Sequence, residues 1–564
     1  MTYTPATQDQ LLAIRVNAGI DDLANSEKFA AAEPDMVEAI VAGIGEFAAG
    51  EWAPLNRIGD IEGAKLENGV VRLPDGFAEA YAHYVEQGWN AISGPVGFGG
   101  QGLPFTLSCN VLENLGTANM AFNLLPMLSV GAIESLDHHG SAELQEKYLP
   151  KLVSGEWSGT MNLTEPQAGS DVGALRTTAR PISEGEHAGK YLIKGQKIYI
   201  TWGEHDLAEN IIHLVLARIE GAPEGIKGVS LFVVPKYMVG EDGSLGERNA
   251  CSCGGLEEKM GIHGNATCVM NYDGATGFLV GEEHKGMRTM FVMMNEARLG
   301  VGLQGLSQAV VAYQNAVDFA KDRLQGRSLT GPKAPEKPAD PIIVHPDVRR
   351  MLMDQKAFLE GARALTYWTA FQGDLQHKSP DEKVREKAGD YMALLTPVIK
   401  AYLTHMGFEK ANQALQLHGG SGFTREWGLE QIVRDCRITL IYEGTNGVQA
   451  LDLVGRKLAS NGGRAVFSFF GEVDEFINSA DGDADMAPFI EGLTTLKAQL
   501  QEATTWLMQN GMTDFNNAGA SSHDYLHLFG LTGLAFMWAK MAKIALEKKA
   551  AGDPFYEEKL TTGY

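Results

Sequence analysis

A single glutamate, Glu443, stands in the stretch LIYEGTNG (440–447), directly after an apolar run and directly before a glycine. Glutamate is rarely buried without a partner, so a carboxylate in this position needs an explanation. An apolar approach through Leu440 and Ile441 would keep the carboxylate partly from water and raise its pKa, which makes it a candidate general base. The alternative is a structural acid that interacts favourably with the N-terminus of a helix predicted from Asn446 onward.

Two segments upstream have the residue types of a ligand site. MNLTEPQAGSDVGALRT (161–177) is a turn of small and capping residues, where backbone N–H groups could approach a ring system or a phosphate, although it could equally be a simple loop. In GQKIYITWGEHD (195–206), Tyr199 and Thr201 would lie on the same side of a strand by the period of two. An aromatic ring beside a hydroxyl suits a flat heteroaromatic ligand, and sheet packing explains the pair equally well.

The third segment is QLHGGSGFTREWGLEQIVRDCRITLIYEGTNG (416–447), a helix end, a glycine hinge, a second helix and then Glu443. In this order, over most of residues 50–460, the three segments resemble the acyl-CoA dehydrogenase family, whose members carry T-E-P-x-A-G-S-D, a Y-I-T-type strand, Q-x-x-G-G-x-G and Y-E-G-T. Each motif alone is moderately specific, whereas the ordered set is very specific.

The resemblance implies FAD as the cofactor, an acyl-CoA thioester as the substrate, and Glu443 as the base that removes the α proton. It places the flavin against Met161, Leu163, Thr164, Ser170, Tyr199 and Thr201. It places the diphosphate and adenosine end of FAD against Arg323, Gln416 and Gly420, partly from a neighbouring subunit, and it makes Thr445 another contact of the cofactor. The acyl-CoA is expected to meet Ser170, Asn295, Arg298, Tyr442 and Gly444.

Two positions depart from the family pattern. Asn295 stands three residues before Arg298, where many relatives have an aspartate, and Tyr199 replaces a frequent tryptophan.

By physical argument, the reaction needs a base for the weakly acidic Cα proton, an acceptor for the Cβ hydride and donors on the carbonyl oxygen. Glu443 is expected to supply the first, FAD the second, and the backbone N–H of Glu443 with a ribityl hydroxyl the third. Thr445 is a suitable N-cap for the helix after it.

Hydrophobic periodicity predicts the elements that position these residues. Residues 1–155 read as a helical domain and residues 156–285 as a β domain, because short β-branched or aromatic runs there are bounded by turn residues. Residues 286–460 read as a four-helix bundle of long helices, interrupted by a proline-rich surface linker around 330–346, and residues 461–564 as an added helical domain. The expected fold class is mainly α with a central β domain, and the family resemblance implies that this domain is a β-barrel. GFGGQG (97–102) matches a dinucleotide fingerprint but lacks a preceding strand, so a glycine-rich loop is favoured.

Composition limits the partners. The 564 residues carry 47 Lys and Arg against 71 Asp and Glu, a net charge of −24, which excludes nucleic acid and anionic membranes as general partners. Five scattered cysteines argue against a disulfide framework and, with no secretory signal in the first residues, lead us to expect a cytoplasmic protein. The most apolar stretch, near residue 530, contains His527 and is stopped by Lys540, so we expect a buried helix and no membrane span. A metal site is not expected.

The segments 54–72, 201–218 and 442–458 are similar to a long bacterial branch of the family with an added C-terminal helical domain. Members of this branch are often described as acting on the 3-(methylthio)propanoyl thioester, that is, 3-methylmercaptopropionyl-CoA, and others oxidise ordinary acyl-CoAs. Both that substrate and short or medium-chain acyl-CoAs therefore stay open. The resemblance further implies electron-transfer flavoprotein as electron acceptor and a homodimer or higher homo-oligomer. An acyl-CoA oxidase that uses oxygen and a non-catalytic acyl-CoA- or flavin-binding subunit are the alternatives.

Overall fold

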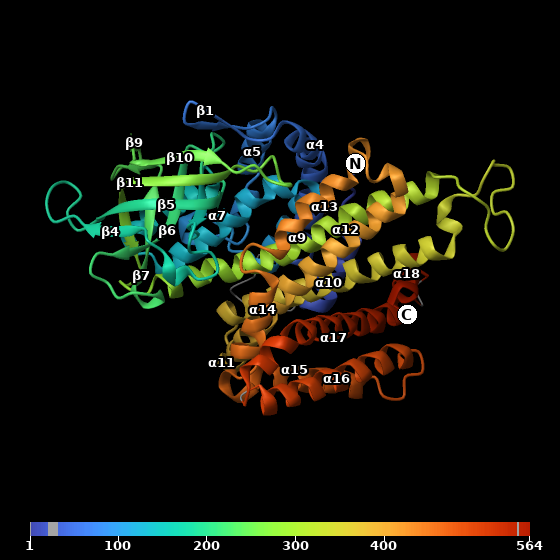
Figure 1. Ribbon diagram of the computed structural model, residues 1–564. Coiled ribbons are helices and arrows are strands. Elements are labelled where there is room, and N and C mark those ends of the chain that lie inside the picture. Colours follow the sequence, from blue (N-terminus) through green and yellow to red (C-terminus); the bar gives the residue numbers. More distant parts are fainter. Residues whose placement is uncertain (1, 21–31, 512, 550–551, 564) are drawn as a thin grey trace. The chain divides into compact units, whose positions relative to one another are not determined.

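The computed structural model describes residues 2–20, 32–511, 513–549 and 552–563. Its contacts group the chain into two compact units (Figure 1). The first unit comprises 1–49, 104–117 and 298–564, and the second comprises 50–103 and 118–297. Each unit contains residues from more than one of the four consecutive domains predicted from the sequence. That division into four domains stays a prediction.

The second unit is built around a closed sheet. Strands β11 (Thr267–Val280), β5 (Tyr191–Thr201), β4 (Thr178–Pro181), β6 (Asn210–Ile219) and β7 (Val229–Pro235) pair in that order, and β7 pairs with β11 again. These five strands form a closed ring. Two further strands pair with stretches of the ring that would otherwise be open: β10 (Cys251–Leu256) pairs with β11, and β3 (Trp157–Asn162) pairs in parallel with β6. The short β-branched and aromatic runs predicted this β domain, and the family resemblance implied that it is a barrel.

Helices in the same unit pack against this barrel and against one another. Helix α7 (Met120–His139) lies directly on β3, because Gly159 has no side chain; a Cβ there would stand 2.4 Å from Ala132 Cβ. Trp52 stacks on Phe122 with ring centroids 4.0 Å apart. The remaining elements of this unit are α4 (Ala53–Glu62), β1 (Lys65–Glu67), β2 (Val70–Arg72), α5 (Phe77–Glu86), α8 (Ala142–Ser154), β8 (Tyr237–Val239) and β9 (Leu245–Arg248).

The first unit is helical. Between residues 286 and 418 it contains α9 (Gly286–Asp322, which enters this unit at Arg298), α10 (Pro346–Lys378), α11 (Glu382–Val398) and α12 (Thr404–His418). A single π turn, η9 (Ile399–Leu403), joins α11 to α12. Glycines let α9 approach this turn closely, because a Cβ on Gly302 would stand 2.6 Å from Ile399 Cγ2 and a Cβ on Gly305 2.5 Å from Leu403 O. The turn η9 is therefore held against the helix that carries Arg298.

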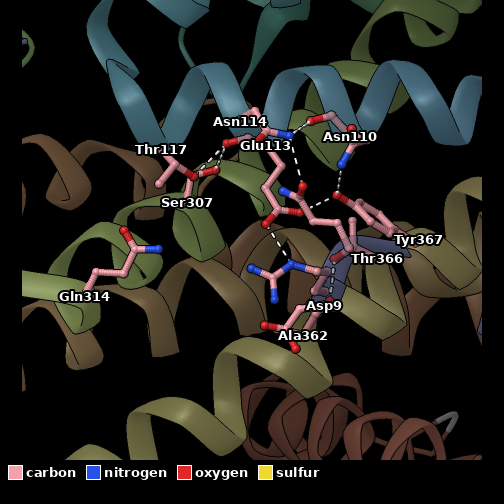
Figure 2. Close-up of polar contacts among 12 residues, drawn as sticks. Asp9, Asn110, Glu113, Asn114, Thr117, Ser307, Gln314, Ala362, Thr366 and Tyr367 are labelled. Atoms are coloured by element: carbon pink, nitrogen blue, oxygen red, sulfur yellow. Dashed lines mark hydrogen bonds and ion pairs between the residues drawn. The ribbon is translucent and has the colours of Figure 1, made fainter. Parts of the chain in front are cut away.

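Buried polar groups connect α6 (Phe105–Ala118) to α9 and α10. Figure 2 shows Glu113 at the centre of this network, where its carboxylate accepts hydrogen bonds from Arg363 Nε at 2.8 Å and from the Tyr367 hydroxyl. Asn110 Nδ2 donates to the same hydroxyl at 3.0 Å, and Ser307 Oγ donates to the Glu113 carbonyl at 3.1 Å. Each buried charge has a partner, which is the condition for tolerating such groups in a core.

One expectation about this unit needs correction. The predicted fourth long helix is short: α14 (Asn446–Asp452) follows α13 (Leu429–Arg437) and ends in a π turn, Leu453–Lys457. The proline-rich segment is largely exposed, as expected, and buried Asp340 orders it by accepting hydrogen bonds from the backbone N–H groups of Ser328, Lys333 and Ala334.

The C-terminal segment of the same unit forms α15 (Arg464–Ser479), α16 (Ala487–Asn510), α17 (Phe515–Lys549) and α18 (Pro554–Gly563). Among the described residues, α17 has the length and apolar composition of a membrane span, but 67% of its most apolar window is buried inside the protein. It is the buried core helix expected near residue 530. The other helices described in this unit are α1 (Thr7–Leu12) and α3 (Pro34–Phe47).

Candidate active site

Glu443 lies in a tight turn between the 3-10 turn Ile438–Leu440 and α14. Its φ is +55° and that of Gly444 is +82°, so two consecutive residues adopt the left-handed conformation that non-glycine residues avoid. Gln449 Nε2 reaches back from α14 and donates to the carbonyl oxygens of Glu443 at 3.2 Å and Gly444 at 3.3 Å. A strained backbone that is fixed by a buried side chain is typical of functional positions.

Gly444 and Thr445 complete this turn. A Cβ on Gly444 would stand 2.4 Å from Gln449 Nε2, so the motif glycine serves both the conformation and the close approach of Gln449. Thr445 occupies the N-cap position of α14, as the sequence predicted, but its side chain makes no capping bond; Oγ1 donates instead to the Leu440 carbonyl at 3.3 Å. The turn is thus closed by Gln449 rather than by the expected cap.

The electrostatic surroundings of Glu443 suit a proton acceptor. Burial raises the pKa of its carboxyl to about 7, and the positive charges of Arg298 and Lys400 act in the opposite direction. Arg298 is 8% exposed, and one of its terminal nitrogens lies 3.8 Å from where a Cβ on Gly444 would be. Ile441 is 51% exposed, so it does not give the full apolar cover that the sequence suggested. A carboxyl with a pKa near neutrality can exchange a proton with substrate.

Tyr442 is partly buried on the same turn and is anchored by its hydroxyl. Its hydroxyl donates a hydrogen bond to the side-chain oxygen of Gln304 on α9. Burial raises the pKa of this hydroxyl, and the charge of Glu443 raises it further. Tyr442 therefore stays neutral and fixes the chain immediately before Glu443. The first unit thus brings Arg298, Tyr442, Glu443, Gly444 and Thr445 into one group.

The second unit holds the residues expected against the flavin. The loop after β3 is bound to β5, because Ile198 N donates to the Thr164 carbonyl at 2.9 Å and Thr160 Oγ1 donates to the Thr201 carbonyl at 2.8 Å. Met161 is the fifth residue of β3, and Leu163 and Thr164 follow that strand directly. Met161, Leu163, Thr164, Tyr199 and Thr201 therefore come from two neighbouring segments.

Tyr199 differs from a regular strand residue. Its φ is +60°, and the register between β5 and β11 shifts between Lys197 and Ile200, which marks a bulge. The bulge interrupts the alternation of side chains, so the period-of-two argument that put Tyr199 and Thr201 on one side does not apply here. Tyr199 is 59% exposed, an unusual environment for a tyrosine ring in a strand. An exposed ring beside two backbone segments fits the face of a planar cofactor.

Glu165, the glutamate of the T-E-P motif, organises this loop. Its buried carboxylate accepts hydrogen bonds from Thr177 Oγ1 at 2.6 Å, from the backbone N–H groups of Arg176 and Thr177, and from Lys197 Nζ at 2.8 Å. Burial alone would raise the pKa of Glu165, but the charge of Lys197 and these hydrogen bonds lower it to about 2. Ser170 lies exposed on the loop that this ion pair holds. The motif glutamate therefore has a structural role that motif matching did not specify.

Arg323, Gln416 and Gly420 form a separate group at the ends of α9 and α12. The two helix ends meet where the ring of Phe319 stacks on His418, with centroids 4.3 Å apart. Arg323, Gln416 and Gly420 are all exposed, as residues that contact a cofactor or a second subunit would be. Asn295 is likewise exposed, on the part of α9 that belongs to the second unit. These positions stay predictions as ligand contacts.

Three residues of the Glu443 group were missed by the sequence analysis. Gln449 and Gln304 hold the turn through side-chain hydrogen bonds, and Lys400 places a buried charge beside it. Gln449 and Gln304 have no sequence signal, because their role depends on the tertiary approach of α14 and α9. Lys400 does have one: it is the single charged residue in the apolar helical run LLTPVIKAYL (394–403).

Comparison with known proteins covers nearly the whole chain. Family models described as Acyl-CoA dehydrogenase N-terminal, middle and C-terminal domains match residues 35–156, 160–275 and 284–458, and one described as Acetyl-CoA dehydrogenase C-terminal like matches 469–563.

Individual relatives agree with these matches. The chain is 42% identical to 3-methylmercaptopropionyl-CoA dehydrogenase of Ruegeria pomeroyi, over 100% of this chain and 95% of that protein. It is 34% identical to the broad-specificity linear acyl-CoA dehydrogenase FadE5 of Mycobacterium tuberculosis, over 99% and 94%. The fold is similar to that of an acyl-CoA dehydrogenase from Bacillus anthracis solved with FAD, with a TM-score of 0.75, 22% identity and coverage of 93% and 84%.

Proposed function

The chain belongs to the acyl-CoA dehydrogenase family, and from this premise we propose that Glu443 is the base that removes the α proton of its acyl-CoA substrate. The enzyme is an FAD-dependent acyl-CoA dehydrogenase that converts the thioester to the 2-enoyl-CoA. FAD, when bound, accepts the hydride from Cβ. The observation that supports the role of Glu443 most strongly is a partly buried carboxyl of pKa about 7 in a turn held by Gln449.

The same turn offers a donor for the thioester carbonyl. Among the described residues, none accepts a hydrogen bond from the backbone N–H of Glu443. A donor fixed by a strained turn needs no reorganisation when negative charge develops on the carbonyl oxygen. We assign this N–H to the oxygen of the thioester, beside the carboxylate that takes the proton. One residue thus supplies both the base and an oxyanion donor.

The residues of the β-barrel unit fit the flavin. Tyr199 presents an exposed ring at a bulge, and the loop 161–170 is held rigidly by the buried pair of Glu165 and Lys197. We propose that Met161, Leu163, Thr164, Ser170, Tyr199 and Thr201 hold the flavin. We propose that Arg323, Gln416 and Gly420 hold the diphosphate and adenosine end of FAD and that Thr445 makes a further contact with the cofactor. We further propose that Ser170, Asn295, Arg298, Tyr442 and Gly444 contact the acyl-CoA.

For the substrate, we propose 3-(methylthio)propanoyl-CoA. The support is the 42% identity to an enzyme of that name over the full chain, compared with 34% to a broad-specificity linear acyl-CoA dehydrogenase. The test is anaerobic bleaching of the flavin by a series of acyl-CoAs from short to long, with the methylthio thioester among them. The proposal predicts the highest ratio of rate constant to half-saturation concentration for the methylthio compound. A higher ratio for any unsubstituted thioester would contradict it.

We also propose electron-transfer flavoprotein as the acceptor, a homodimer or larger homo-oligomer, and a cytoplasmic location. The first two rest on the family. The location is supported by five free, buried cysteines, which suit a reducing compartment. Reoxidation of the reduced enzyme separates a dehydrogenase from an oxidase: the proposal predicts slow reoxidation in air and fast reoxidation by an electron-transfer flavoprotein. Faster reoxidation in air would indicate an oxidase.

A further inference from the structure

Lys400 is a buried lysine with no exposed surface. It lies on the π turn η9, three residues after Pro397 within the preceding helix. Burial of an ammonium group is costly unless an anion or several hydrogen bonds compensate for it. Among the described residues, no carboxylate oxygen lies within 4.0 Å of Lys400 Nζ; its hydrogen bond goes to Asn446 Oδ1, at 2.9 Å. A neutral partner alone does not explain why a lysine is kept here.

The hydrogen bond directs Lys400 to the turn that carries Glu443. Asn446 is the first residue of α14, three residues after Glu443, and its Nδ2 donates to the Ala401 carbonyl at 3.2 Å and to Thr404 Oγ1 at 3.0 Å. The amide oxygen and the amide nitrogen of Asn446 therefore both form hydrogen bonds with the segment 400–404. The π turn, which moves a side chain off the regular helical positions, and Asn446 together hold the ammonium beside the Glu443 turn.

We propose that Lys400 is a positioning residue for catalysis: its buried ammonium, together with Arg298, keeps the Glu443 carboxylate ionised before proton abstraction. This inference rests on the proposed role of Glu443 as the base. It assigns no contact between Lys400 and the substrate. The function of the lysine is to set the charge state of another residue.

The charges in this region support the proposal. Burial lowers the pKa of Lys400 to about 7, the charge of Glu443 raises it, and that of Arg298 lowers it. Conversely, Arg298 and Lys400 both oppose the effect of burial on Glu443. The carboxylate and the ammonium therefore stabilise each other's charged forms. Without the lysine, burial would leave Glu443 protonated over more of the neutral range.

The other charged groups near Lys400 act mainly on residues other than Lys400. Asp452 and Arg456 affect Arg298, and Lys457 lies with them at the end of α14. From α17, His523 and His527 pack against His405, and His527 also packs against Tyr402. The two charges that act on Lys400 are thus Glu443 on the α14 side and Arg298 on α9.

The test is the pH dependence of flavin bleaching in the FAD-loaded enzyme, measured anaerobically with saturating acyl-CoA. Lys400→Met removes the charge at similar length, and Lys400→Gln is a second neutral variant that can still donate to Asn446. Since an opposite charge nearby shifts a carboxyl pKa by about 1 unit or more, both variants should move the midpoint of the rate profile about 1 unit to higher pH. The rate below the midpoint should fall about tenfold. Lys400→Arg should restore the wild-type midpoint.

The matched control is Lys410→Met on α12, which also removes a buried lysine, one paired with Asp354 at 2.7 Å. It should alter stability without moving the midpoint. If Lys400→Met or Lys400→Gln reduces the rate equally at every pH, or lowers only thermal stability, the proposal is wrong and the lysine is merely structural. Failure of the base assignment is recognised separately, because Glu443→Gln would then bleach the flavin at the wild-type rate.

Discussion

Gln449 Nε2 donates a hydrogen bond of 3.2 Å to the carbonyl oxygen of Glu443 and so fixes the backbone that carries the proposed base. The same nitrogen occupies the space that a side chain on Gly444 would need. The conformation of the turn, its glycine and the glutamine six residues after Glu443 are therefore one structural unit. This relationship gives the first prediction.

Gly444→Ala should slow flavin bleaching by substrate about tenfold to a hundredfold, because its Cβ would displace Gln449 and shift the carboxylate from its reactive position. Gly447→Ala on α14 is the control: a Cβ there meets nothing within 4 Å. It should leave the rate unchanged and stabilise the helix by about 0.5–1 kcal/mol. Stopped-flow absorbance measures both rates. Equal rates for the two variants would show that the turn tolerates a side chain at Gly444.

The rate of flavin bleaching should rise with pH through about 7, the raised pKa of Glu443. The ionised carboxylate is the proton acceptor, so below this pKa the rate should fall about tenfold per pH unit, and above it the rate should level off. Circular dichroism across the same pH series separates this effect from unfolding. A rate that is constant between weakly acidic and weakly alkaline pH would be inconsistent with Glu443 as the base.

Glu165→Gln should destabilise the β-barrel unit by about 3–5 kcal/mol, because it leaves Lys197 buried without an anion. Both side chains are buried, and five donors converge on the Glu165 carboxylate. Denaturant unfolding measures the free energy, and absorbance measures the FAD retained. Glu156→Gln, which breaks a partly exposed pair with Lys151, is the control and should cost at most about 1 kcal/mol. Similar losses in the two variants would show that the buried pair has no special role.

Tyr199→Ala should weaken FAD binding about tenfold, since loss of an aromatic contact costs about 0.5–1.5 kcal/mol. The ring is more than half exposed, so folding should be unaffected. Tyr199→Phe keeps the ring and should bind FAD as the wild type does. Fluorescence titration of the apoprotein gives the dissociation constants. Unchanged affinity in Tyr199→Ala would place the flavin elsewhere.

Much of the architecture was predictable from local patterns. The run NIIHLVLARI coincides with β6, and the alternation in 190–201 predicted β5, because strands that bury one or both faces have distinctive sequences. Glu443 and its turn were found through motifs in a fixed order. The comparisons with known proteins confirm the family and the fold class.

What could not be predicted depends on contacts between distant segments. The bulge at Tyr199 arises from the register of β11 opposite β5, and no local pattern encodes it. The environment of Lys400 depends on glycines of α9 that let that helix approach η9. Residues 446–458 carry a helical period, yet a π turn ends the regular helix after Asp452. In each case tertiary packing decided the outcome.

The most direct test of the central claim is the rate of anaerobic flavin bleaching by acyl-CoA in Glu443→Gln, with FAD content and thermal stability measured on the same preparation. The amide keeps the shape of the side chain and cannot accept the proton. We predict normal FAD content and a rate at least about a thousandfold below that of the wild type, the loss expected when a general base is removed. Bleaching at the wild-type rate by a fully FAD-loaded variant would contradict the account.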